Sequence, residues 1–278
     1  MKYKIYEDKI EITESNTFDI KSILESGQMF RFKQIKNEWI VQSGDKVAKI
    51  CQLDDKKYIL KSKNLKYFEN FFDFQTNYDI IQTELSKFSY MRPALEFSKG
   101  VRILKQQPLE TLICFIISAN NNISRIKKSV NYICEHFGKK LDENLFAFPT
   151  LDELSKITEK DFILAGTGYR APYLVKTIKE LKNGFGLEQL KLIPTEEAKQ
   201  KLLNLAGVGP KVADCVLLFG LEHKKVFPVD TWIAKVYNDY FETETNRIKM
   251  RKKLVETFGD LSGIAQQYLF YYKREIKN

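Results

Sequence analysis

The sequence has few of the residues that build metal centres. In 278 residues there are only two histidines, His136 and His223, and four cysteines, at positions 51, 114, 134 and 215. No pair of cysteines has the Cys-x2-Cys type of spacing that holds zinc or an iron–sulfur cluster, and neither histidine has a second ligand nearby. We therefore expect no metal site built by the protein.

Long apolar runs are absent as well. No stretch reaches the ~18 uninterrupted apolar residues that a membrane helix needs. The N-terminal segment 1–8 carries charge too soon for a secretory signal. These absences predict a cytoplasmic protein with no membrane partner.

Negative charge is in deficit relative to positive charge. Lys and Arg number 45 against 36 Asp and Glu, which leaves a formal charge of +9. This surplus favours a polyanionic partner, and a partner such as DNA would associate the protein with the nucleoid. The hydrophobic fraction of 44% is ordinary for a globular protein, and the length allows about two domains at roughly 150 residues each.

Hydrophobic periodicity divides the chain near residue 95. Before that point apolar residues recur at every second position, as at Trp39 and Val41, and turn signals follow, as in 43–45, which is the pattern of short antiparallel strands. After it the apolar residues follow helical spacing, as in 123–137. We predict an α+β protein with a small N-terminal antiparallel sheet domain at 1–95 and a larger all-helical region at 96–278.

A helix–hairpin–helix is indicated at 198–220. Gly207-Val208-Gly209 forces a turn after an apolar helix face, and Pro210 stands where a second helix would begin. Two glycines let the backbone approach a ligand, and a helix N-terminus beside them adds about half a positive charge, so the pattern suits a phosphate. The alternative is an ordinary corner between two helices.

Two ionisable residues accompany this hairpin. Lys211 lies one residue inside the second helix, where the dipole opposes a cation and favours the neutral amine that a nucleophilic lysine needs. Asp230 directly precedes a run with helical spacing, 231–240, so it is predicted to cap a helix, and a capping carboxylate beside a groove can also act on charge or protons. The alternatives are a solvated lysine and a plain cap.

These motifs together resemble the DNA glycosylases of the helix–hairpin–helix (HhH-GPD) superfamily, and within it the 8-oxoguanine DNA glycosylase/AP lyases. The resemblance covers nearly the whole chain and rests on motifs in the family's order: Gly27-Gln-Met-Phe-Arg31, Ser118-Ala-Asn-Asn-Asn-Ile-Ser-Arg125, Gly166-Thr-Gly-Tyr-Arg-Ala171, Gly207-Val-Gly-Pro-Lys-Val-Ala-Asp-Cys215 with Pro228-Val-Asp230, and Ile264-Ala-Gln-Gln-Tyr-Leu-Phe270. It implies a bifunctional enzyme that flips 8-oxoguanine, or a similar oxidised purine, out of duplex DNA, excises it and nicks the strand.

The resemblance implies catalytic roles for the two ionisable residues. Lys211 would attack C1′ of the damaged nucleotide, expel the base and form a Schiff base, and β-elimination would then break the strand. Asp230 would stabilise the positive charge that develops on the sugar and assist proton movement.

The resemblance also implies a pocket for the base. The carbonyl of Gly27 would accept the N7–H that 8-oxoguanine has and guanine lacks. Gln266 would read the Watson–Crick edge, and Phe270, four residues on, would stack on the base. Cys215 would form the opposite wall and Pro228 would line the pocket. From spacing alone, a plain turn glycine, a surface amide and a core aromatic are the alternatives.

Further residues would contact DNA outside the pocket. Those that would fill the vacated stack and contact the orphaned base are Asn120, Arg125, Tyr169 and Arg170. Those that would bind DNA at the hairpin are Gly207, Gly209 and Val212. Trp232 stands where eukaryotic members often have histidine, which leaves the preference for cytosine opposite the lesion open.

Two other functions compete with this one. A glycosylase for another damaged base is disfavoured, because relatives that remove adenine or thymine glycol carry a four-cysteine iron–sulfur loop and no cysteine follows Cys215. Relatives that remove alkylated bases lack a lysine at the position of Lys211. A non-catalytic DNA-binding module would need neither Lys211 nor Asp230. We expect a monomer without a cofactor, and an alkali ion at the hairpin stays open.

Overall fold

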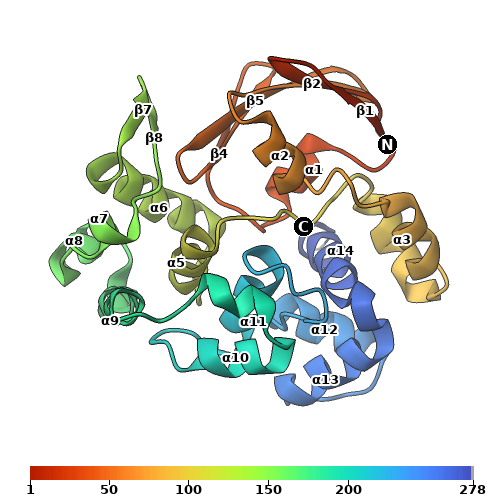
Figure 1. The fold of residues 1–278 in the computed structure, drawn as a ribbon. Coiled ribbons are helices and arrows are strands. Elements are labelled where there is room, and N and C mark those ends of the chain that lie inside the picture. Colours follow the sequence, from red (N-terminus) through yellow and green to blue (C-terminus); the bar gives the residue numbers. More distant parts are fainter. Residues whose placement is uncertain (277–278) are drawn as a thin grey trace.

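The computed structural model describes residues 1–276 and joins a sheet domain to a larger helical region (Figure 1). The sheet has six antiparallel strands in the order β1-β2-β6-β5-β4-β3. Its strands are β1 (Lys2–Ile5), β2 (Lys9–Glu14), β3 (Phe32–Ile35), β4 (Glu38–Ser43), β5 (Lys46–Asp54) and β6 (Lys57–Lys61). The apolar faces of α1 (Ile20–Glu25) and α2 (Leu65–Phe71) share a hydrophobic core with it.

Helices make up most of the remaining chain. They are α3 (Tyr78–Leu85), α4 (Arg92–Phe97), α5 (Pro108–Ser118), α6 (Ile123–Phe137), α7 (Leu151–Leu154), α8 (Glu159–Leu164), α9 (Ala171–Lys182), α10 (Thr195–Leu203), α11 (Pro210–Phe219), α12 (Thr231–Tyr240), α13 (Arg247–Phe258) and α14 (Ser262–Glu275). Short 3-10 turns occur at η1 (Ser89–Met91), η2 (Gly168–Arg170), η3 (Glu188–Leu192) and η4 (Gly259–Leu261). The prediction of a sheet domain followed by a helical region is confirmed.

The prediction that the second region is all-helical is wrong at one place. A two-stranded hairpin, β7 (Lys140–Asp142) with β8 (Leu145–Phe146), follows α6. Gly138 ends α6, and a Cβ there would lie 2.0 Å from the carbonyl oxygen of Ala147. The chain therefore returns antiparallel on itself after α6, with a turn made by polar residues, instead of starting another helix.

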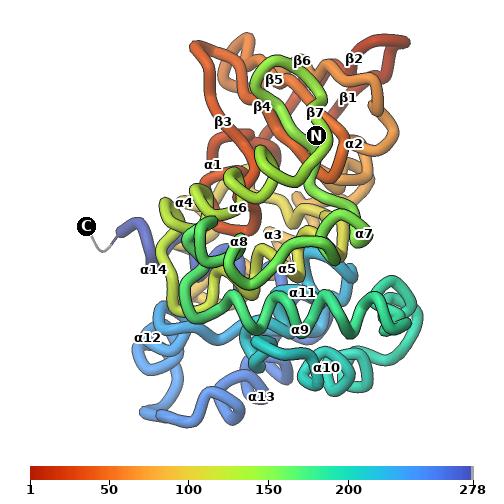
Figure 2. Tube along the Cα trace, turned by 90° about the vertical axis from the view of Figure 1, so that its left-hand side faces the viewer, coloured from red at the N-terminus to blue at the C-terminus, as the bar shows by residue number. Residues whose placement is uncertain are grey.

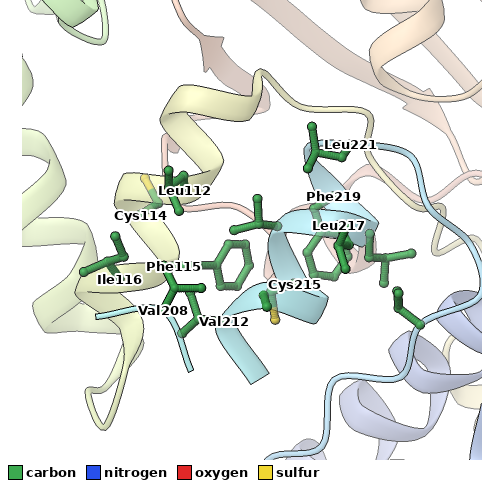
Figure 3. Close-up of a cluster of buried hydrophobic side chains, with 14 of the residues drawn as sticks. Leu112, Cys114, Phe115, Ile116, Val208, Val212, Cys215, Leu217, Phe219 and Leu221 are labelled. Carbon is green, nitrogen blue, oxygen red and sulfur yellow. The ribbon is translucent and has the colours of Figure 1, made fainter. Parts of the chain in front are cut away.

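The helix α5 lies between the sheet domain and the lower helices (Figure 2). Nearly all its residues are buried, as expected of a helix that is apolar on every side. Figure 3 shows its side chains packed against those of α11. The rings of Phe115 and Phe219 are stacked, with their centres 5.5 Å apart. This packing fixes α11 against the centre of the molecule.

A buried cluster of charges ties α11 to the helices on its other side. Asp214 of α11 is 1% exposed, and its Oδ1 lies 2.9 Å from the amine of Lys199 on α10. Its Oδ2 lies 2.7 Å from Nε of Arg251 on α13, and Arg251 also pairs with the exposed Glu196 at 3.0 Å. One carboxylate thus joins three helices.

Replacing that carboxylate should destabilise the protein strongly. In Asp214→Ala the amine of Lys199 and the guanidinium of Arg251 lose a buried counter-charge, which costs about 3–5 kcal/mol of unfolding free energy. Urea denaturation followed by circular dichroism measures the loss. Glu196→Gln, which removes only the exposed outer pair, should cost about 1 kcal/mol or less. Equal losses in the two variants would contradict this account.

Candidate active site

A cleft of about 850 Å³ opens beside the hairpin formed by α10 and α11. Its walls come from the loop after α1, from α5, from the turn before α6, and from the starts of α11, α12 and α13, with α14 closing one side. The residues proposed from the sequence that line it are Gly27, Asn120, Gly207, Gly209, Lys211, Val212, Asp230 and Phe270. Segments far apart in the sequence therefore meet at one place.

The hairpin turn needs both of its glycines for different reasons. Gly207 has φ of +78°, and a Cβ there would lie 2.8 Å from Cβ of Tyr173. Gly209 is the N-cap of α11, and a Cβ on it would meet nothing within 4 Å. Gly207 thus serves the fold, whereas Gly209 keeps the approach to the helix N-terminus open on the side of the cleft.

Lys211 lies at the cleft wall against apolar and sulfur-bearing neighbours. Its amine is 5.0 Å from the centre of the Phe115 ring. One turn further along α11 is Cys215, which is buried, and burial raises the pKa of its thiol to about 11, with the nearby Lys211 side chain partly offsetting the rise. The thiol is therefore neutral at physiological pH and forms a close, uncharged wall beside the amine.

Asp230 caps α12, as the sequence predicts. Its Oδ1 accepts hydrogen bonds of 2.9 Å from both the Trp232 and the Ile233 amides. Both capping bonds go to Oδ1, so the cap does not use Oδ2, and the residue lines the same cleft as Lys211. The cap holds the carboxylate in place at the point where the cleft begins.

The loop that carries Gly27 is fixed on both sides. Gln267 of α14 donates to the Ser26 carbonyl at 2.8 Å. The buried amide of Gln28 donates to the Arg102 carbonyl and accepts from the Leu104 amide, each at 2.8 Å. Gly27 itself has φ of +84° and faces the cleft. The hydrogen bonds of Ser26 and Gln28, on either side of Gly27, thus hold the backbone of the glycine in place.

The remaining pocket residues lie behind the cleft surface. Gln266 is 5% exposed, and its Oε1 has no hydrogen-bond partner within residues 1–276. Pro228 is buried in the loop before α12. A buried amide oxygen without a hydrogen-bond donor lowers the stability of the protein. Oε1 of Gln266 can therefore still accept a hydrogen bond from a polar ligand.

The structure separates the residues proposed for DNA outside the pocket. Arg125 and Tyr169 are exposed, and Asn120 sits at φ of +49° in the turn before α6. Arg170 is buried instead, and its guanidinium donates to the carbonyls of Ala119 and Asn120, the latter at 2.8 Å. In this conformation Arg170 does not reach the cleft; it supports the strained turn that presents Asn120.

Several cleft residues escaped sequence reasoning. Phe115 lies in a helix that is apolar on every side, so nothing marked it as a ligand contact. Arg274 follows Phe270 by four residues, and this spacing was the available signal. With Lys211 and Arg247 it gives the cleft three cations against Asp230, the single carboxylate among its described lining residues. That balance suits a polyanion.

Neither a metal site nor a membrane span emerges from the described part of the chain. Residues 1–276 hold no group of three or more His, Cys, Asp or Glu that could bind a metal ion. No helix among them is long and apolar enough to cross a bilayer.

Comparison with known proteins identifies two regions. Residues 9–112 match the family model described as 8-oxoguanine DNA glycosylase, N-terminal domain, and residues 113–259 match that of the HhH-GPD superfamily base excision DNA repair proteins. An N-glycosylase/DNA lyase of Arabidopsis thaliana is 39% identical over 62% of this chain and 52% of its own length. The N-glycosylase/DNA lyase of Saccharomyces cerevisiae is 33% identical over 69% of this chain and 54% of its own length.

Solved structures extend the likeness over the full length. The 8-oxoguanine glycosylase/lyase of Clostridium acetobutylicum, in complex with DNA containing cytosine opposite 8-oxoguanine, is 38% identical with a TM-score of 0.94, covering 100% of this chain and 99% of that one. The chain spans about half the length of the plant and yeast relatives.

Proposed function

The chain belongs to the 8-oxoguanine DNA glycosylases of the HhH-GPD superfamily, and we propose that it excises 8-oxoguanine from duplex DNA and then cleaves the strand. The observation that carries this proposal is the meeting of Lys211 and Asp230 at one cleft beside the hairpin. The hairpin amides and the cations of the cleft would hold the phosphates, while the damaged nucleotide turns out of the helix into the cleft.

The chemistry follows from the positions of the two residues. The Lys211 amine attacks C1′, the C1′–N9 bond breaks, and the base leaves with the electron pair. The nitrogen bonded to C1′ gives up a proton to the departed base, and opening of the sugar ring at O4′ then gives the Schiff base. Removal of a C2′ proton expels the 3′ phosphate by β-elimination. Asp230 stabilises the positive charge on the sugar in the first step, because its fixed carboxylate costs no reorganisation when that charge develops.

The pocket side of the cleft supports the choice of substrate. The carbonyl of Gly27 would accept the N7–H of 8-oxoguanine, and Phe270, whose ring lies against Gly27, would stack on the base. Gln266 would use its unsatisfied amide oxygen on the Watson–Crick edge. Cys215 and Pro228 would form the buried wall behind. A DNA-binding module without chemistry gives no reason for a lysine and a carboxylate at this cleft.

Single-turnover assays test the proposal. Duplexes carry 8-oxoguanine opposite each of the four bases, and matched duplexes carry guanine. We expect release of 8-oxoguanine followed by strand cleavage, with undamaged guanine left intact. Tight DNA binding without base release would favour the non-catalytic module, and release of another damaged base alone would favour a different glycosylase. The comparison of opposing bases also measures the preference for cytosine, which Trp232 in place of histidine leaves open.

Replacing Gly27 should reduce selectivity for the lesion. A Cβ there would lie 2.8 Å from Nη1 of Arg274 and 3.2 Å from the Phe270 ring, at a φ of +84° that only glycine adopts easily. In Gly27→Ala the carbonyl shifts from N7–H, and losing that hydrogen bond lowers the ratio of excision rates on 8-oxoguanine and guanine about tenfold. Gly184→Ala is the control, because Gly184 has φ of +101° with nothing within 4 Å. An unaltered ratio in Gly27→Ala would show that Gly27 does not help to distinguish 8-oxoguanine from guanine.

A further inference from the structure

One face of α14 carries three polar or aromatic side chains in successive turns; Phe270 and Arg274 line the cleft, and Gln266 lies behind its surface. Gln266, Phe270 and Arg274 are spaced by four residues and therefore lie in one row. The two ends of the row carry unsatisfied polar atoms: both Oε1 of Gln266 and Nη1 of Arg274 are buried without a hydrogen-bond partner within residues 1–276. An amide and a guanidinium with unused bonding capacity thus flank one aromatic ring.

The guanidinium of Arg274 is held firmly by its other nitrogens. Nη2 donates to the Glu25 carbonyl at 2.5 Å, and Nε donates to Glu275 at 2.7 Å. The side chain is 15% exposed, and its guanidinium carbon lies 5.3 Å from the centre of the Phe270 ring. Nη1 therefore lies buried beside Gly27, and Arg274 as a residue is part of the cleft lining.

The order of the row indicates which edge of a bound purine Arg274 meets. The inference rests on the proposed function, in which Gln266 reads the Watson–Crick edge and the base stacks on Phe270. Arg274 lies about 12 Å from Gln266 along the helix, beyond the ring and next to Gly27. It therefore faces the five-membered ring, where 8-oxoguanine carries its additional oxygen, O8.

We propose that Arg274 is a specificity-determining residue whose Nη1 donates a hydrogen bond to O8 of the flipped base. When the C1′–N9 bond breaks, the electron pair passes to N9 and delocalises onto O8. A guanidinium donor at O8 then interacts more strongly with the departing anion than with the bound base, so it lowers the barrier to excision. Normal guanine has no oxygen at C8 and gains nothing from this contact.

The test compares Arg274→Met with the native chain on duplexes containing 8-oxoguanine or 8-thioguanine. A thiocarbonyl sulfur accepts hydrogen bonds weakly, so exchanging O8 for sulfur removes the partner while the N7–H remains. We expect Arg274→Met to slow single-turnover excision of 8-oxoguanine about tenfold or more. The exchange of oxygen for sulfur should slow the native chain considerably more than it slows the variant.

Two controls separate this role from damage to the fold. Lys273→Met removes the same charge from the neighbouring position, where the lysine pairs with Asp239 outside the cleft lining, and it should excise 8-oxoguanine at the native rate. Strand cleavage at a preformed abasic site, which contains no base, should fall far less in Arg274→Met than excision does. Equal penalties for sulfur in native chain and variant, or native excision by Arg274→Met, would overturn the inference. A native chain that excises no 8-oxoguanine would instead refute the proposed function.

Discussion

Lys211→Gln should neither release 8-oxoguanine nor form a covalent complex with DNA. The amine at the start of α11 is the group that must bond to C1′, and the amide of glutamine cannot form a Schiff base. Borohydride reduction traps that intermediate, so the native chain should give a protein–DNA adduct on a duplex with 8-oxoguanine. The adduct should vanish in the variant, and excision should fall to the background rate.

A matched lysine in the same hairpin provides the control for this result. Lys201 on α10 is half exposed and pairs with Glu197, so Lys201→Gln removes an equal charge without touching the cleft. It should form the adduct at the native rate. Lys211→Gln should still bind the damaged duplex, since the glycines of the hairpin turn and the other cleft cations remain. A persistent adduct in Lys211→Gln would mean that another amine is the nucleophile.

The structural elements that hold Lys211 and Asp230 could be predicted from local patterns in the sequence. The Gly207–Gly209 turn, the start of α11 at Pro210 and the cap of α12 by Asp230 all depend on neighbours within a few residues. Glycine, proline and a capping carboxylate act through backbone geometry, and this is why they could be recognised without the structure. The resemblance then placed Gly27 and Phe270 at the same cleft, and the structure brings them together with Lys211.

The directions of the Arg170 and Arg274 guanidinium groups depend on contacts with residues far away in the sequence, so they could not be predicted from it. Arg170 is part of a motif, yet the direction of its guanidinium depends on the carbonyls of Ala119 and Asn120, some 50 residues away. The role of Arg274 likewise depends on a bond to the Glu25 carbonyl, 249 residues earlier in the chain. A cation on a helix face is usually just solvated, so only the contacts made in the folded chain distinguish these two from other basic residues.

Asp230→Asn should slow base release on the order of 10²-fold or more while leaving the protein as stable as before. Asparagine caps helices as well as aspartate does, so the amides of Trp232 and Ile233 keep an acceptor. What is lost is the negative charge beside the developing positive charge on the sugar, and a fixed electrostatic group of this kind has a large effect on the rate. Single-turnover excision, duplex binding and thermal unfolding measure the three quantities separately.

The contrast with two further variants identifies the charge as the cause. Asp239→Asn removes a carboxylate from the other end of α12, where it pairs with Lys273, and should excise 8-oxoguanine at the native rate. Asp230→Ala loses the cap as well as the charge, so it should lose about 1 kcal/mol of stability in addition to activity. If Asp230→Asn turned over like the native chain, the carboxylate would be only a helix cap, and the positive charge on the sugar would need another source of stabilisation.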